Sequence, residues 1–207
     1  MAANVDPDSA LMLRVKQGDR AAFETLVERY KQPVTNLVYR TINDLTEAED
    51  LAQTVFLQVY RAADRYRASA KFSTWLFTIA RNLCLNELRR RARHPAESLD
   101  AGRPDQDDEP ARQFEDVRSS TAAEHALQHE LARKINEAIA ELPEAQRTAL
   151  LLYREEELSY EDICGVLGCS LSATKSLIHR ARETLKAKLK PYLRTGVWQT
   201  PQKQQQL

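Results

Sequence analysis

A short basic segment near the C-terminus carries the residue types that bind DNA. At about 100° per residue, one side of a helix beginning at Leu171 carries Ser172, Lys175, Ser176, His179 and Lys186. Hydroxyl, ammonium and imidazole groups can reach phosphates and base edges. From Ser170 to the end, the chain holds eight Lys or Arg and one acid. The pattern favours DNA binding over the commoner solvated helix face.

The flanking residues place this helix second in a helix-turn-helix. Ser159 is a good N-cap, and Asp162 follows three residues later, as in a capping box. Gly168 can take the left-handed conformation that ends a helix, and Ser170 can cap the next one. The apolar side of the second helix, predicted to pack on its own domain, consists of Leu171, Thr174, Ile178, Ala181 and Leu185.

A second candidate surface lies on a helix predicted from about residue 73 to 91. Away from its core stripe it carries Thr74, Thr78, Arg81, Asn82, Asn86 and Arg89. Phe72 and Trp75 stand at its start and RRRAR at its end, and such mixtures of rings and cations bind single-stranded nucleic acid. The alternatives are that Trp75 and Phe77 are core residues and that the arginines complement the helix dipole.

Composition indicates an all-α chain of one or two small domains. Of the 207 residues 43% are hydrophobic, Gly is scarce and β-branched runs are short. No apolar run approaches the ~20 residues needed to cross a bilayer, and the start MAANVDPDSA does not read as a signal peptide. Three cysteines without a CxxC pair fit a reducing cytosol. His125 and His129 lack a Cys partner, so surface histidines are favoured over a metal site.

The zero net charge is unevenly distributed. Residues 1–94 hold 15 basic and 11 acidic side chains, and residues 125–207 hold 12 and 10. The segment between them is acidic, with three basic and nine acidic side chains. It is also rich in proline, so we expect a flexible acidic linker over 95–122 and a disordered tail over 194–207.

Four helices are expected before the linker. Ser9 and Asp19 are candidate caps of the first two, and Thr46 with Glu49 of the third, which ends near residues 60–64. Pro33 should kink or break the second helix. After the linker, a helix bearing Leu127, Leu131, Ile135, Ala138 and Leu142 is followed by one that starts at Pro143.

Four segments, in order, carry a resemblance to a known family. They are GDRAAFETLVERY (18–30), AEDLAQTVFLQVYRAADRYR (48–67), KFSTWLFTIARNLCLNELRRRAR (71–93) and ELPEAQRTALLLYREEELSYEDICGVLGCSLSATKSLIHRARETLK (141–186). Together they resemble an extracytoplasmic-function (ECF) sigma factor of bacterial RNA polymerase. The resemblance implies two small helical domains, a sigma-70 region 2 bundle in 1–94 and a region 4 helix-turn-helix in 123–193.

The resemblance also implies roles for individual residues. The polymerase-binding set is Asp50, Gln53, Gln58 and Arg61. The set that melts and reads the −10 element is Arg67, Lys71, Phe72, Trp75, Arg81, Asn82, Asn86 and Arg89, with Ala68 in the same loop and Asn82 near a flipped base. Within the helix-turn-helix at 159–182, the −35 set is Ser172, Lys175, Ser176, His179, Arg180 and Arg182.

Two positions depart from the family pattern. Thr54 replaces an acid that is common in the polymerase-binding helix, and Leu177 stands where many relatives carry Arg. The second change removes a cation from the recognition helix, which puts the usual phosphate contact in doubt.

The implied function is cytoplasmic, promoter-specific transcription initiation. The partners would be core RNA polymerase, promoter DNA and an anti-sigma factor, with no cofactor, no metal and no catalysis of its own. The alternative is a stand-alone helix-turn-helix regulator. Such proteins usually bind as dimers, and the sequence has one recognition helix and no evident dimerisation helix. A helical interaction protein that never touches nucleic acid is disfavoured by the basic and aromatic helix at 72–93.

Overall fold

The computed structural model describes residues 6–93, 122–154, 156 and 158–195, and within them every regular element is helical. The helices are α1 (Pro7–Lys16), α2 (Arg20–Ile42), α3 (Leu45–Arg61), a short 3-10 helix η1 (Ala63–Arg65), α4 (Phe72–Arg93), α5 (Ala122–Ala140), α6 (Glu144–Arg154), α7 (Tyr160–Leu167) and α8 (Leu171–Thr195). The all-α prediction is confirmed. The acidic linker, the tail beyond Thr195, and the side chains of His125, Leu127 and His129 lie outside the described residues.

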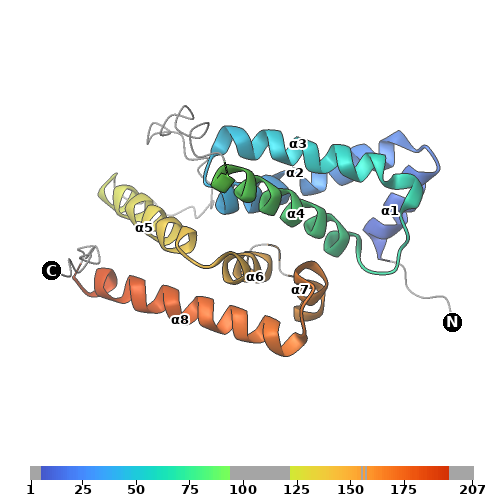
Figure 1. Ribbon diagram of the computed structural model, residues 1–207. Helices are drawn as coiled ribbons and strands as arrows, with labels where there is room; N and C mark the ends of the chain where they lie inside the picture. Colours follow the sequence, from blue (N-terminus) through green and yellow to red (C-terminus); the bar gives the residue numbers. More distant parts are fainter. Residues whose placement is uncertain (1–5, 94–121, 155, 157, 196–207) are drawn as a thin grey trace.

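Helices α1 to α4 form a bundle around an apolar core (Figure 1). Its largest enclosed side chains include Met12, Leu26, Phe72, Leu76 and Phe77. Val38 of α2, Val55 of α3 and Ala80 of α4 are buried in this core. Burying such stripes is the main source of helix stability in a domain of this size.

Two helices begin at caps other than those expected. The side chain of Asp6, not of Ser9, caps α1, accepting from the Ser9 amide at 3.1 Å. The side chain of Asp44, not of Thr46, caps α3, accepting from the Glu47 amide at 3.0 Å. In both cases an aspartate shortly upstream supplies the acceptor, and the helix gains part of an extra turn.

Two prolines lie inside helices. Of the kink or break expected at Pro33, the break does not occur, because α2 is continuous from Arg20 to Ile42. Helix α8 likewise runs through Pro191 to Thr195, beyond the expected end of the ordered chain. Pro143 immediately precedes α6, whose first residue is Glu144, one position later than expected.

The loop before α4 is anchored by buried polar contacts. The Tyr66 hydroxyl donates to the Ser9 hydroxyl at 3.0 Å, and the Phe72 amide donates to Asp6 at 3.2 Å. Nearby, the Tyr30 hydroxyl donates to Asp8 at 2.6 Å, and burial together with the Asp8 carboxylate raises the pKa of Tyr30. These contacts fix both ends of the segment that carries Arg67 and Lys71.

The helix-turn-helix forms as expected. The Ser159 hydroxyl accepts from the Asp162 amide at 3.1 Å and caps α7, and Gly168 ends that helix at a φ of 65°. The Ser170 hydroxyl accepts from the Ala173 amide at 3.2 Å at the start of α8. The motif buries three apolar side chains, those of Ile163, Val166 and Ile178. Their packing holds α8 against the remaining helices.

The helices before and after the acidic segment pack on one another. One continuous cluster of buried apolar residues extends from Met12 to Ile178, and α7 lies against the N-terminal part of α4 (Figure 1). Arg147 of α6 donates to the carbonyl of Thr41 in α2 at 2.8 Å, and burial lowers the pKa of this guanidinium. No helix among the described residues is both long and apolar enough to cross a bilayer.

Candidate nucleic-acid interface

The outward side of α8 presents a continuous polar and basic surface. Its exposed side chains include all six residues of the expected duplex-binding set: Ser172, Lys175, Ser176, His179, Arg180 and Arg182. On the opposite side Thr174, Ile178 and Ala181 are buried. The helical periodicity of the sequence therefore separated the two sides correctly over most of the motif.

Two leucines of α8 behave differently from their neighbours. Leu171 was expected to pack, but its side chain is 38% exposed at the start of the helix. Leu177, at the position where the family pattern has a cation, is half-buried and packs against the core. Leu177 thus contributes to the fold, and the phosphate contact of an arginine there is absent from this recognition helix.

Two stacked tyrosines support the basic side chains of α8. The rings of Tyr153 in α6 and Tyr160 in α7 lie 5.1 Å apart at 26°. The Arg182 guanidinium lies 4.8 Å from the Tyr153 ring and the Lys175 ammonium 5.6 Å from the Tyr160 ring. Hydrogen bonds from Tyr160 and Arg182 also lower the pKa of Tyr153. Cation–π contacts orient a charge without neutralising it, and among the described residues neither cation forms an ion pair with a carboxylate.

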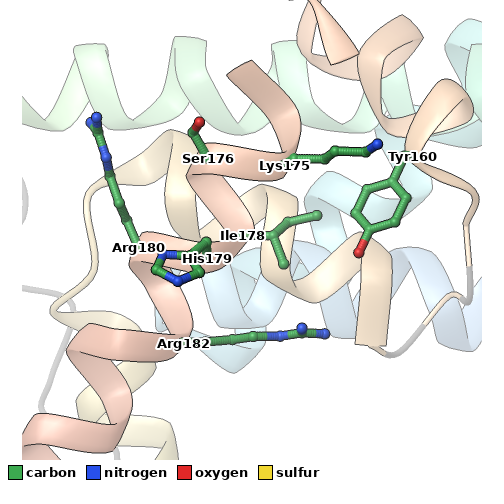
Figure 2. A pocket seen from close by; sticks show the side chains of 7 residues that line it. All are labelled: Tyr160, Lys175, Ser176, Ile178, His179, Arg180 and Arg182. Atoms are coloured by element: carbon green, nitrogen blue, oxygen red, sulfur yellow. The ribbon is translucent and has the colours of Figure 1, made fainter. Parts of the chain in front are cut away.

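An open hollow of about 480 Å³ lies beside Tyr160 and α8 (Figure 2). Its lining consists of Tyr160, Lys175, Ser176, Ile178, His179, Arg180 and Arg182. Lys175 and Arg182 extend toward Tyr160, whereas Arg180 points away from them. Sequence reasoning missed the tyrosine pair. The available signal was two tyrosines seven residues apart that flank the EEE segment at 155–157. The packing of α6 against α7 brings their rings together.

Helix α4 divides the expected single-strand-binding residues into an exposed and an enclosed group. Asn82, Asn86 and Arg89 are exposed and follow one another at helical spacing. The Phe72 ring is enclosed in the core, and Trp75 is half-buried against Tyr66, with ring centroids 4.9 Å apart. The Phe72 ring is therefore covered by the protein, whereas Trp75 packs against Tyr66 and keeps part of its surface exposed.

Two of the expected α4-side cations are held by carboxylates from the C-terminal half of the chain. Lys71 donates to Asp162 of α7 at 2.7 Å, and Arg81 donates through two nitrogens to Glu144 of α6 at 3.1 and 3.3 Å. Arg67 and Ala68, in the same loop as Lys71, are exposed. At the end of α4, Arg90 and Arg91 both pair with Glu47 and Glu87, so two arginines of the RRRAR cluster are also held within the chain.

Helix α3 exposes a mixed polar and apolar side. The four expected polymerase-binding residues are exposed along it: Asp50, Gln53, Gln58 and Arg61. Between them Leu57 is 54% and Tyr60 55% exposed, and Tyr60 contacts Phe23 of α2 with centroids 5.0 Å apart. The hydroxyl of Thr54, at the other departure from the family pattern, bonds to the Asp50 carbonyl at 3.0 Å. Sequence reasoning missed Leu57 and Tyr60. The available signal was that these two large apolar residues lie on a different side of the helix from the buried Val55.

Comparison with known families matches both halves of the chain. Residues 26–94 match sigma-70 region 2, and residues 132–185 match sigma-70 region 4. The chain is 38% identical over 189 residues to the RNA polymerase sigma-H factor of Pseudomonas aeruginosa, covering 91% of this chain and 97% of that protein. It is 35% identical over 195 residues to the ECF RNA polymerase sigma-E factor of Haemophilus influenzae, covering 90% and 97%. The chain belongs to the ECF sigma factors of the sigma-70 family.

A solved structure shares the fold of this ECF sigma factor. The Bartonella quintana sigma factor RpoE, solved in complex with the anti-sigma factor NepR, matches 81% of this chain and 96% of its own with a TM-score of 0.63. At 24% identity this likeness concerns the fold alone. Within the described residues no three His, Cys, Asp or Glu side chains are grouped as a metal site would require.

Proposed function

We propose that this sigma factor binds core RNA polymerase through α3, reads a −35 duplex with α8 and captures melted −10 bases with α4. The observation that carries the proposal is the exposed basic side of α8 on a capped helix-turn-helix, in a chain that belongs to the ECF family. Catalysis would be left to polymerase, in the cytoplasm, and an anti-sigma factor would be a further partner, as one is for the Bartonella protein.

The α8 residues suit readout of a duplex major groove. Lys175 and the arginines supply charge for phosphates, whereas Ser172, Ser176 and His179 can hydrogen-bond to base edges. The Tyr153–Tyr160 stack supports this role because it holds Arg182 and Lys175 extended before DNA arrives. Preorganised side chains lose less conformational entropy on binding.

The exposed residues of α4 suit capture of unpaired bases. The carboxamides of Asn82 and Asn86 both donate and accept, and can bond to the edge of a base that has left the helix. Such capture costs a few kcal/mol of unstacking per base, which pocket contacts must offset. Arg67, Lys71, Arg81 and Arg89 would hold the strand, while Phe72 would support the surface from within the core and Trp75 would present its exposed edge.

The α3 side suits a protein partner. Leu57 and Tyr60 are exposed on this side, and polar residues lie beside them: Asp50, Gln53, Gln58 and Arg61. This arrangement resembles an interface with an apolar centre and a polar rim. We assign this side to polymerase.

Reconstitution tests the proposal as a whole. Purified protein, core polymerase and genomic DNA from the source bacterium should yield new transcription start sites that share one pair of upstream motifs. Start sites are mapped by sequencing the RNA 5′ ends, with core polymerase alone as control. A chain that binds duplex as a dimer but forms no complex with core polymerase would contradict the assignment.

Asn82→Ala should impair promoter melting without weakening polymerase binding. Losing a base contact should reduce the open complex about tenfold, the effect of roughly 1.4 kcal/mol. The measurement is permanganate reactivity of promoter thymines alongside polymerase affinity. Gln32→Ala removes another exposed carboxamide, on α2, and should change neither. Equal losses of melting and polymerase binding would make Asn82 a structural residue.

Lys175→Ala should weaken duplex binding and lower its salt dependence. If Lys175 neutralises one phosphate, the slope of log K against log salt falls by about one. Fluorescence anisotropy over a salt series measures this slope. Lys190→Ala removes an exposed lysine near the other end of α8 and serves as the matched control. An unchanged slope for Lys175→Ala would place this cation off the DNA.

Leu57→Ala should weaken polymerase binding by about tenfold while leaving DNA binding intact. The expected loss of about 1–2 kcal/mol is that of an apolar side chain at an interface centre. Binding to core polymerase is measured by titration with labelled sigma factor. Leu193→Ala truncates a leucine that is 67% exposed on α8, and it should leave the affinity unchanged. Comparable losses in both variants would point to a general surface effect.

A further inference from the structure

Two of the three cysteines lie at the turn between α7 and α8. Cys164 belongs to the last turn of α7, and Cys169 directly follows Gly168, the residue that ends this helix. The Sγ atoms of both cysteines lie 3.2 Å from the same oxygen atom, that of the Thr174 hydroxyl. The two sulfurs are therefore separated by at most twice that distance. Both residues are half-buried, so neither is sealed inside the core.

The backbone of the turn keeps the two cysteines together. The Gly168 amide donates to the Cys164 carbonyl at 2.8 Å, and the Cys169 amide donates to the same carbonyl at 3.3 Å. Gly168 permits this reversal because its φ of 65° would strain a residue that carries a Cβ atom. In such a helix ending, the side chains at these two positions frequently touch. A disulfide needs Cα atoms within about 7 Å of each other, and the hydrogen bond between the two backbones favours such a separation.

The third cysteine of the chain is placed differently. Cys84 is 1% exposed in the core, and burial raises the pKa of its thiol to about 12. Because the thiolate is the reactive form, Cys84 is expected to be inert. A thiol pair can also bind a soft metal, but such sites use three or four protein ligands, and within the described residues no third His, Cys, Asp or Glu joins this pair. The chemistry open to Cys164 and Cys169 is therefore that of a dithiol.

The oxygen that the two sulfurs share belongs to the recognition helix. Thr174 is completely buried on the inner side of α8, next to the exposed Lys175. A thiol can donate a hydrogen bond to the Thr174 hydroxyl, whereas a disulfide has no hydrogen to donate. Forming the bond also brings the sulfurs to about 2.05 Å, so at least one of them must move. Because binding side chains must be held within about 0.5 Å of their working positions, a shift at the start of α8 affects the surface assigned to duplex DNA.

We propose that Cys164 and Cys169 are a redox modification site, at which hydrogen peroxide closes a reversible disulfide that weakens duplex binding by α8. One thiolate attacks a peroxide oxygen, so that an S–O bond forms, the O–O bond breaks and water leaves. The second sulfur then attacks the sulfenic acid, so that the S–S bond forms, the S–O bond breaks and a second water leaves. Two thiols are oxidised, and one peroxide is reduced to two waters. Disulfides in the cytosol are usually transient and catalytic or redox-sensing. The disulfide itself is independent of the proposed function, whereas its effect on duplex binding rests on that function.

Peptide masses test the disulfide directly. Reduced full-length protein is treated with hydrogen peroxide, unfolded, alkylated with iodoacetamide and cleaved with trypsin. Both cysteines of the turn lie in one tryptic peptide, 155–175, and Cys84 lies in another, 82–89. After peroxide the 155–175 peptide should carry no alkyl label and be lighter than its unlabelled dithiol form by two hydrogen atoms, whereas Cys84 should be fully alkylated. Dithiothreitol added before alkylation should restore both labels.

Fluorescence anisotropy tests the effect on DNA, using a labelled duplex that carries the upstream motif found by start-site mapping. Peroxide should weaken wild-type binding about tenfold, comparable to the loss of one base contact, and dithiothreitol should restore it. Cys164→Ser and Cys169→Ser each keep a hydroxyl in place of the thiol but cannot form the disulfide, so peroxide should leave their affinity unchanged. Cys84→Ala removes the buried thiol and serves as the matched control, which should respond to peroxide as wild type does. Circular dichroism confirms that each variant retains its helix content.

The proposal is overturned if peroxide leaves both alkyl labels on the 155–175 peptide, or if it joins two protein molecules instead. It is also overturned if the disulfide forms without changing duplex affinity, or if either serine variant still loses affinity in peroxide. Failure of the proposed function would show differently, as missing polymerase-dependent start sites and no duplex binding by the reduced protein. The peptide masses would still decide whether the disulfide forms.

Discussion

The carboxylate of Asp162 joins the two halves of this sigma factor. It belongs to the first turn of α7, where a negative charge is favoured by the helix dipole and where it bonds to the capping Ser159 at 2.6 Å. The same group holds Lys71 and Thr74 at the start of α4. Asp162 therefore both stabilises the start of α7 and, through separate contacts, docks the helix-turn-helix on α4.

This docking needs a fixed receiving surface, which the N-terminal bundle provides. Asp6 caps α1 and also accepts from the Phe72 amide, so one side chain ties the start of the first helix to the start of α4. The Tyr66–Ser9 bond holds the other end of the intervening loop. Because this segment is anchored at both ends, the position of Lys71 is fixed. A mobile loop would not hold Lys71 in one position.

Local signals explain what could be predicted from the sequence. Ser159, Gly168 and Ser170 act within three or four residues, so the helix-turn-helix and its exposed side were predictable. The caps of α1 and α3 were misplaced because Asp6 competes with Ser9, and Asp44 with Thr46, within the reach of one turn. Contacts between distant segments were invisible: Arg81 and Glu144 are 63 residues apart, and no local pattern marks either as the partner of the other.

The two surfaces assigned to DNA differ in how their cations are held. On α8, Lys175 and Arg182 rest on tyrosine rings, and within the described residues neither is paired with a carboxylate. On the α4 side, Lys71 and Arg81 are paired with carboxylates of α7 and α6. A ring leaves the charge available, whereas a carboxylate cancels it. The cations of the α8 surface are therefore free of carboxylate partners among the described residues, whereas two cations on the α4 side are already paired within the chain.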